Sequence, residues 1–133
     1  MPFDFALDHP AQDSRKLSGL SNYLDGLSAE NSVANYYVQC GAIVLHRRWR
    51  GRAGEIDLVA RDETGFIFVE VKKARTHSDA AQHLSRAQLT RICASADDYL
   101  GTHGHSLMSN VRIDLATVDG TGQIETVPNI SLF

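Results

Sequence analysis

The stretch Gly54–Lys73, GEIDLVARDETGFIFVEVKK, decides the fold. Two of its segments, Gly54–Arg61 and Phe66–Lys73, are rich in β-branched and aromatic residues, and the DETG between them has the composition of a tight turn. The stretch therefore predicts a β-hairpin, with Asp62 opposite Gly65 at the turn.

This register places Asp57 opposite Glu70 and Glu55 opposite Lys72. Directly opposed side chains have Cβ atoms about 4.5–5.5 Å apart. Two opposed carboxylates destabilise a hairpin unless positive charge lies between them. Lys72 supplies one such charge, and a hard divalent cation such as Mg²⁺, which favours carboxylate oxygens, would supply another.

Two acids and a lysine around a metal are what phosphodiester hydrolysis requires, because the metal polarises the phosphate and the lysine orients the attacking water. The alternative is a surface hairpin whose exposed face simply carries charges. The apolar residues that surround Glu70, from Phe66 to Val71, favour a strand covered on both faces and hence the functional interpretation.

GEIDLVARD and FIFVEVKK resemble the signature of the YraN-type UPF0102 proteins, a family similar to archaeal Holliday-junction resolvases in the restriction-endonuclease-like superfamily. The resemblance extends from about residue 26 to residue 127. It implies a PD-(D/E)xK nuclease site with Asp57 as the first acid and with Glu70 and Lys72 as the E-x-K. It also implies that Asp57, Glu70 and the backbone carbonyl of Val71 hold Mg²⁺ or Mn²⁺, while Lys72 aligns the attacking water.

A helix is expected from Leu24 or Ser28 to Gln39 or Cys40, because apolar residues recur there at helical spacing. Glu30 lies in its first turns. Acids are common there because they interact favourably with the helix dipole. The resemblance implies another role, as an extra metal ligand or a water-positioning carboxylate.

The segment HRRWRGR carries a cluster of arginines, Arg47, Arg48, Arg50 and Arg52. Guanidinium groups bind phosphate oxygens in pairs, so these residues are candidates for contact with a nucleic-acid backbone. We expect Trp49 to be a half-buried core residue. The formal net charge of the whole chain is −3, which is unusual for a nucleic-acid enzyme, but this segment is locally positive.

A polar connection follows Lys73. Arg75 within it could reach substrate phosphate, but the favoured interpretation is a solvated loop residue. A second helix is expected over Ser85–Leu100, capped by Ser85. The resemblance implies an arginine where Ala74 stands and a lysine where Gln88 stands. Gln88 could still hydrogen-bond phosphate, or it is merely an exposed helix position.

Further strands are expected at Ala42–Trp49, Val111–Val118 and Gln123–Val127, with Arg112 and Asp114 forming a structural ion pair. The helical crossover before residue 111 makes two strands parallel. The predicted fold class is α/β, with a mixed β-sheet flanked by helices in the αβββαβ arrangement of the restriction-endonuclease-like core. We expect residues 23–133 to form one domain and residues 1–22 to form an arm or weak helix outside the core.

The sequence therefore predicts a Mg²⁺-dependent or Mn²⁺-dependent endonuclease acting on DNA, with a preference for branched, junction or otherwise distorted forms, since no residues suggest that base edges are read. The alternative is a nucleic-acid-binding module that keeps the fold but has little or no catalysis. The analogy with resolvases implies a homodimer. No apolar run suits a membrane span and the N-terminus does not resemble a secretory signal, so a cytoplasmic location is expected.

Overall fold

The computed structural model describes residues 10–130, with side chains described for residues 19–20 and from Asp25 onward. Its elements, in chain order, are α2 (Pro10–Gln39), β1 (Ile43–Arg50), β2 (Glu55–Asp62), β3 (Gly65–Lys73), α3 (His77–Gln82), α4 (Arg86–Thr102), β4 (Val111–Val118) and β5 (Ile124–Val127). None of the helices in this described part is long and apolar enough to cross a membrane.

The five strands form one sheet in the order β1-β2-β3-β4-β5. Neighbouring strands are antiparallel except β3 and β4, which are parallel because α3 and α4 connect them. The β2–β3 ladder pairs Asp62 with Gly65, which confirms the predicted register of the hairpin. The protein therefore has the predicted α/β class, with a mixed sheet and flanking helices as in a restriction-endonuclease-like core.

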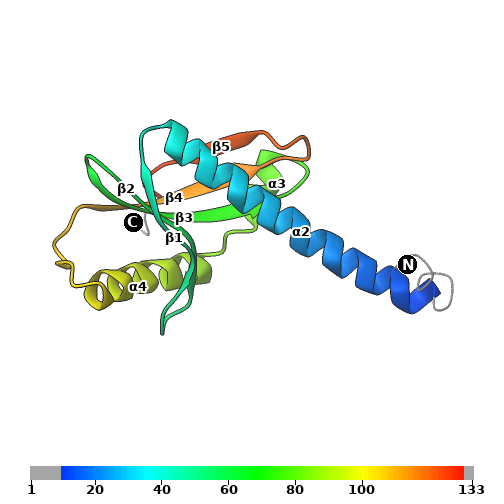
Figure 1. The fold of residues 1–133 in the computed structure, drawn as a ribbon, viewed down its shortest axis with the longest axis horizontal. Helices are drawn as coiled ribbons and strands as arrows, with labels where there is room; N and C mark the ends of the chain where they lie inside the picture. Colours follow the sequence, from blue (N-terminus) through cyan, green and yellow to red (C-terminus); the bar gives the residue numbers. More distant parts are fainter. Residues whose placement is uncertain (1–9, 131–133) are drawn as a thin grey trace.

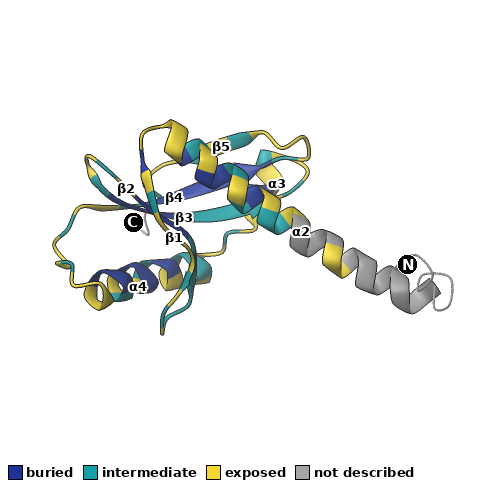
Figure 2. Cartoon of the chain, in the orientation of Figure 1, coloured by how far each residue is buried: buried dark blue, intermediate teal, exposed yellow. Residues whose placement is uncertain are grey.

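The two long helices cover opposite faces of the sheet (Figure 1). Val33 and Tyr37 of α2 belong to a buried cluster that includes Val69 of β3. The adjacent Phe68 belongs to a second cluster with Tyr99 of α4. Successive side chains of a strand point to opposite faces, so β3 is buried on both faces along its first half, as the sequence predicted (Figure 2).

Two helical segments differ from the sequence expectations. Helix α2 begins at Pro10 rather than at Leu24 or Ser28, so residues 10–22 of the expected arm are helical, whereas residues 1–9 lie outside the described part. The connection after β3, expected to be a polar loop, contains α3. The Thr76 side chain accepts a hydrogen bond from the Asp79 N–H at the start of this short helix. Ala80 is the buried residue of the helix.

The predicted ion pair between Arg112 and Asp114 is present. Asp114 is only 1% exposed, and Nε of Arg112 lies 3.1 Å from its Oδ1. The Tyr37 hydroxyl and the Asn129 N–H also donate to this carboxylate, at 2.7 and 2.9 Å. A buried charge with this many donors is satisfied where it stands, which fits a structural role.

Candidate active site

The β2–β3 ladder ends at the pair Leu58–Val69, so the two strands part at the candidate site. The expected opposed pairs, Asp57–Glu70 and Glu55–Lys72, lie beyond the end of this ladder. In their place Oδ2 of Asp57 accepts a hydrogen bond from the Val71 N–H at 2.8 Å. The Asp57 side chain thus accepts the hydrogen bond that a backbone carbonyl of β2 would accept if the ladder continued.

The carboxyl groups of Asp57 and Glu70 nevertheless come together. Burial is the largest cause that raises the pKa of Glu70, to about 8; the charge of Asp57 and a hydrogen bond between the two carboxyl groups add to it. A Glu70 with this pKa holds a proton at neutral pH, which lets it donate to Asp57. The carboxyl groups of Asp57 and Glu70 therefore repel each other when both are ionised.

Lys72 supplies the positive charge beside this pair. Its Nζ lies 3.1 Å from Oε2 of Glu70, and the two side chains are only 17% and 12% exposed. The Lys72 charge and its hydrogen bond lower the pKa of Glu70, against the larger effects of burial and Asp57. Asp57, Glu70 and Lys72 thus form one cluster in the half-buried gap between β2 and β3.

The backbone of Val71 faces the same gap. In a strand, the N–H and C=O of one residue point toward the same neighbouring strand. Since the Val71 N–H meets Asp57 of β2, the Val71 carbonyl also points toward β2, beyond the end of the ladder. This orientation makes the carbonyl available as the ligand that the sequence comparison with nucleases implied.

Glu30 approaches the cluster from α2. Burial, the charge of Asp57 and, to a smaller extent, the charge of Glu55 raise the pKa of Glu30, while Arg48 lowers it. Nε of Arg48 lies 3.6 Å from Glu30 and 3.3 Å from Glu55. Glu30 is therefore close enough to Asp57 to interact with its charge, and an arginine balances the acids on this side.

The backbone is distorted where Arg48 meets this site. Arg48 has a φ of 53°, in the left-handed region that residues with a Cβ rarely adopt. The β1–β2 ladder passes from Arg47–Leu58 to Trp49–Ile56 without pairing Arg48 with Asp57. The β1–β2 ladder also shifts register between Val44 and His46, but the left-handed residue Arg48 is the irregularity that lies next to the first acid of the predicted motif.

The other arginines of the HRRWRGR segment also have partners. Arg47 donates to the Asn31 side chain, Arg50 lies 3.1 Å from Glu55, and the highly exposed Arg52 lies 3.9 Å from Asp98. Glu55, expected opposite Lys72, instead pairs with Arg48 and Arg50. Trp49 is partly buried against the α4 cluster, as predicted.

The two remaining candidates for substrate contact differ from each other. Oε1 of Gln88 accepts from the Ser85 N–H at 3.2 Å, and Oγ of Ser85 accepts from the Gln88 N–H at 3.1 Å, so Gln88 completes a capping box. Arg75 is exposed, and its side chain has no ion pair or hydrogen bond with any residue that the structure describes.

The donors in the gap suit a hard divalent cation that retains water. Among the described side chains, those of residues 19–20 and 25–130, no group of three or more His, Cys, Asp and Glu is arranged to hold a metal ion. Two carboxylates and one carbonyl remain, from Asp57, Glu70 and Val71. Mg²⁺ is commonly bound by one or two carboxylates with waters and substrate phosphates as its other ligands, so this donor set fits it.

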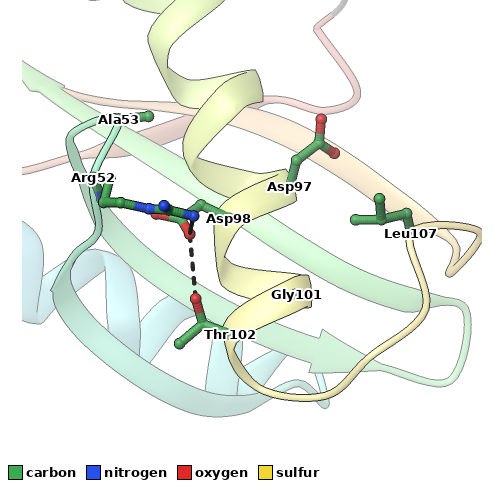
Figure 3. A pocket seen from close by; sticks show the side chains of 7 residues that line it. All are labelled: Arg52, Ala53, Asp97, Asp98, Gly101, Thr102 and Leu107. Atoms are coloured by element: carbon green, nitrogen blue, oxygen red, sulfur yellow. Dashed lines mark hydrogen bonds and ion pairs between the residues drawn. The ribbon is translucent and has the colours of Figure 1, made fainter.

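An open hollow of about 590 Å³ lies elsewhere, between the β1–β2 turn and α4 (Figure 3). It is lined by Arg52, Ala53, Asp97, Asp98, Gly101, Thr102 and Leu107. Oδ2 of Asp98 accepts from the Arg52 N–H at 2.8 Å, and its Oδ1 accepts from Thr102 at 3.2 Å. A side chain at Gly51 would collide with Asp98, so this contact holds the turn tightly against the helix.

Replacing Asp98 with alanine should lower the free energy of unfolding by about 1–3 kcal/mol, because the Arg52 N–H and the Thr102 hydroxyl lose a charged acceptor. Urea denaturation measures this change. The matched control is Asp97→Ala, which removes an exposed acid from the same turn of α4 and should change stability by less than about 0.5 kcal/mol. Equal effects of the two substitutions would contradict the role assigned to Asp98, which is to hold the β1–β2 turn against α4.

Reasoning from the sequence did not assign Arg48 as the counter-ion of the acids. The sequence does contain part of the information, because a hairpin built on the Gly51–Gly54 turn places Arg48 opposite Asp57. The left-handed backbone of Arg48, which breaks this pairing, has no signal in the sequence, since arginine is not a residue type that favours positive φ.

Comparison with known proteins identifies the family of this chain. The sequence model of the family described as "Uncharacterised protein family UPF0102" matches residues 29–118. A UPF0102 protein of Cereibacter sphaeroides is 44% identical over 113 residues, covering 85% of this chain and 97% of the relative. One from Ruegeria pomeroyi is 44% identical over 111 residues, covering 84% and 90%. The chain belongs to the UPF0102 family.

Proposed function

We propose that this protein is a metal-dependent nuclease that hydrolyses DNA phosphodiester bonds, with a preference for branched or junction DNA. The observation that carries the proposal is the cluster of Asp57, Glu70 and Lys72 in the half-buried gap where β2 and β3 part. Carboxyl groups whose pKa is strongly perturbed by burial and by a neighbouring charge are typical of catalytic sites.

Asp57, Glu70 and the Val71 carbonyl would hold Mg²⁺ or Mn²⁺. When bound, the ion supplies charge stabilisation to the phosphate and lowers the pKa of water in the site. Lys72 orients the attacking water and offsets the charge that develops on the phosphate. Glu30 assists from α2, where its carboxylate lies within range of the Asp57 charge.

Substrate contacts would come from the basic side chains around the gap, including Arg47, Arg48, Arg50, Arg52 and Arg75, with Gln88 at the start of α4. Contacts with phosphate oxygens position a nucleic acid without reading its sequence, which supports selection by DNA shape. A homodimer would allow two symmetric cuts in a junction. Bacterial DNA lies in the cytoplasm, so we place the proposed reaction there.

The decisive experiment is cleavage of labelled junction, flap and duplex DNA with Mg²⁺ or Mn²⁺. The wild-type protein should cut a branched form faster than the duplex, and Asp57→Asn should cut at least about 100-fold more slowly because it removes a charged metal ligand. The matched control is Glu63→Gln, which removes an exposed carboxylate at the opposite end of the same hairpin. Intact DNA in every wild-type reaction would overturn the proposal.

A second candidate function is a binding module with the nuclease fold and little catalysis. The observation that favours it is Gln88, which occupies a position where the family resemblance implies lysine and whose Oε1 is used in the capping box of α4. This position therefore brings no charge to the phosphate. Metal-independent binding of branched DNA without cleavage would support this second function.

A further inference from the structure

The basic side chains near the candidate site fall into two sets with different partners. The first set, from the HRRWRGR segment, is held by neighbouring groups of the protein. Arg48 and Arg50 pair with Glu55, and Arg52 pairs with Asp98. An arginine that already pairs with a carboxylate gains less from a phosphate, by at most the small free energy that an exposed ion pair is worth.

The second set consists of Lys73, Arg75 and Arg86. All three residues are exposed, and none of their side chains forms an ion pair or hydrogen bond with another described residue. The surrounding chain is strongly basic: residues 71–96 contain five lysines and arginines and one acid, Asp79. Lys72 is compensated by Glu70, and the other four basic residues give this segment a local excess of positive charge in a chain whose net charge is −3.

The second set begins directly at the candidate site. Lys73 follows Lys72, the lysine that contacts Glu70, at the end of β3. The end of β3, α3 and the start of α4 lie at the same end of the sheet (Figure 1). Successive side chains of a strand point to opposite faces, so the Lys73 side chain lies on the other face of the sheet from Lys72. A phosphate chain that leaves the β2–β3 gap would meet these basic residues by passing around the end of β3.

The backbone under these side chains is fixed. The Ala74 N–H donates to the Val118 carbonyl at 3.1 Å, and the Arg75 carbonyl accepts from the Gly120 N–H at 3.1 Å. Arg86 is the first residue of α4, whose start is fixed by the Ser85 capping box. The charges thus extend from an ordered backbone, which lowers the entropy cost of binding.

We propose that Lys73, Arg75 and Arg86 form a surface, the β3–α4 basic surface, that binds the phosphate backbone of nucleic acid. The choice of nucleic acid as the partner rests on the proposed nuclease function and on charge complementarity. Contacts of this surface with phosphate oxygens would contribute affinity and salt dependence without sequence preference.

The test measures binding of fluorescently labelled branched DNA by anisotropy in EDTA, so that cleavage plays no part. The variant K73Q/R75Q/R86Q is compared with R47Q/R50Q/R52Q, which removes the same charge from the first set. We expect the former to bind on the order of 100-fold more weakly near 0.1 M salt and to reduce the slope of log K against log salt by about 2–3. The latter should lose affinity by a smaller factor, because Arg50 and Arg52 already have carboxylate partners.

Equal losses in the two variants, a larger loss in R47Q/R50Q/R52Q, or no DNA binding by the wild type would overturn the inference. Sedimentation with phosphatidylglycerol vesicles provides a second arm. If K73Q/R75Q/R86Q loses vesicle binding but keeps DNA binding, the partner is a membrane surface and the inference is wrong. DNA that binds through this surface and stays intact with Mn²⁺ would refute the nuclease function alone. Cleavage with unchanged binding by K73Q/R75Q/R86Q would refute the inference alone.

Discussion

Lys72→Met is expected to reduce the rate of DNA cleavage by about 100- to 1,000-fold while leaving Mn²⁺ binding intact. The lysine lies 3.1 Å from Glu70 and is not among the proposed metal ligands, so its removal should affect the attacking water and the developing phosphate charge and leave metal affinity unharmed. Single-turnover cleavage measures the rate, and calorimetry with Mn²⁺ measures the affinity.

This result would show that Lys72 and Asp57 have different roles, because replacing Asp57 should impair both DNA cleavage and Mn²⁺ binding. Arg61→Met is the matched control, because it removes one positive charge from β2 at the end far from the site, where Arg61 lies over the Phe66 ring. Loss of Mn²⁺ binding in Lys72→Met, or full cleavage by this variant, would contradict the division of roles between the acids and the lysine.

The second large effect is a pH dependence of stability in the metal-free protein. The folded protein holds the proton of Glu70 up to a pKa of about 8, whereas the unfolded chain releases it near 4.5. The stabilisation from this group is complete below pH 4.5 and is lost as the pH rises toward 8. Between about pH 5.5 and 8.5, the free energy of unfolding should fall by on the order of 3 kcal/mol relative to Glu70→Gln.

Urea denaturation in EDTA at several pH values measures this difference. Glu70→Gln retains the shape and the hydrogen bonding of the protonated acid, so its own stability should depend much less on pH over this range. Glu30, whose pKa is also raised, contributes in the same direction in both proteins and cancels in the comparison. Parallel curves for the two proteins would show that Glu70 is ionised in the folded state at neutral pH.

The register of the central hairpin could be predicted because turn chemistry and side-chain alternation both specify it. The point where the ladder ends could not be predicted. It depends on whether the Asp57 side chain or a backbone carbonyl meets the Val71 N–H, and both options suit the same sequence. The predicted register also placed Asp57 next to Glu70. Glu55, expected opposite Lys72, instead pairs with Arg48 and Arg50 of β1.

The helix boundaries show another limit of sequence reasoning. The start of α2 at Pro10 was missed because Gly19 and Gly26 weaken the helical pattern, although proline suits the first position of a helix. The short helix α3 was missed because six polar and small residues carry no periodicity. Cap residues gave mixed results: Ser85 was predicted to cap the second long helix and does so, whereas Ser28, an expected start of the first helix, lies inside α2.

The parallel pairing of β3 with β4 has a consequence for the order in which the chain folds. Strands β1 to β3 are joined by short turns, whereas β4 pairs with β3 only after the connection from residue 74 to residue 110 has been made. Closing so long a loop is entropically costly and slow, so we expect the meander to assemble first, during synthesis. The two acids would then meet in a nascent chain whose third strand still has a bare edge, open to chaperones or to unwanted strand partners.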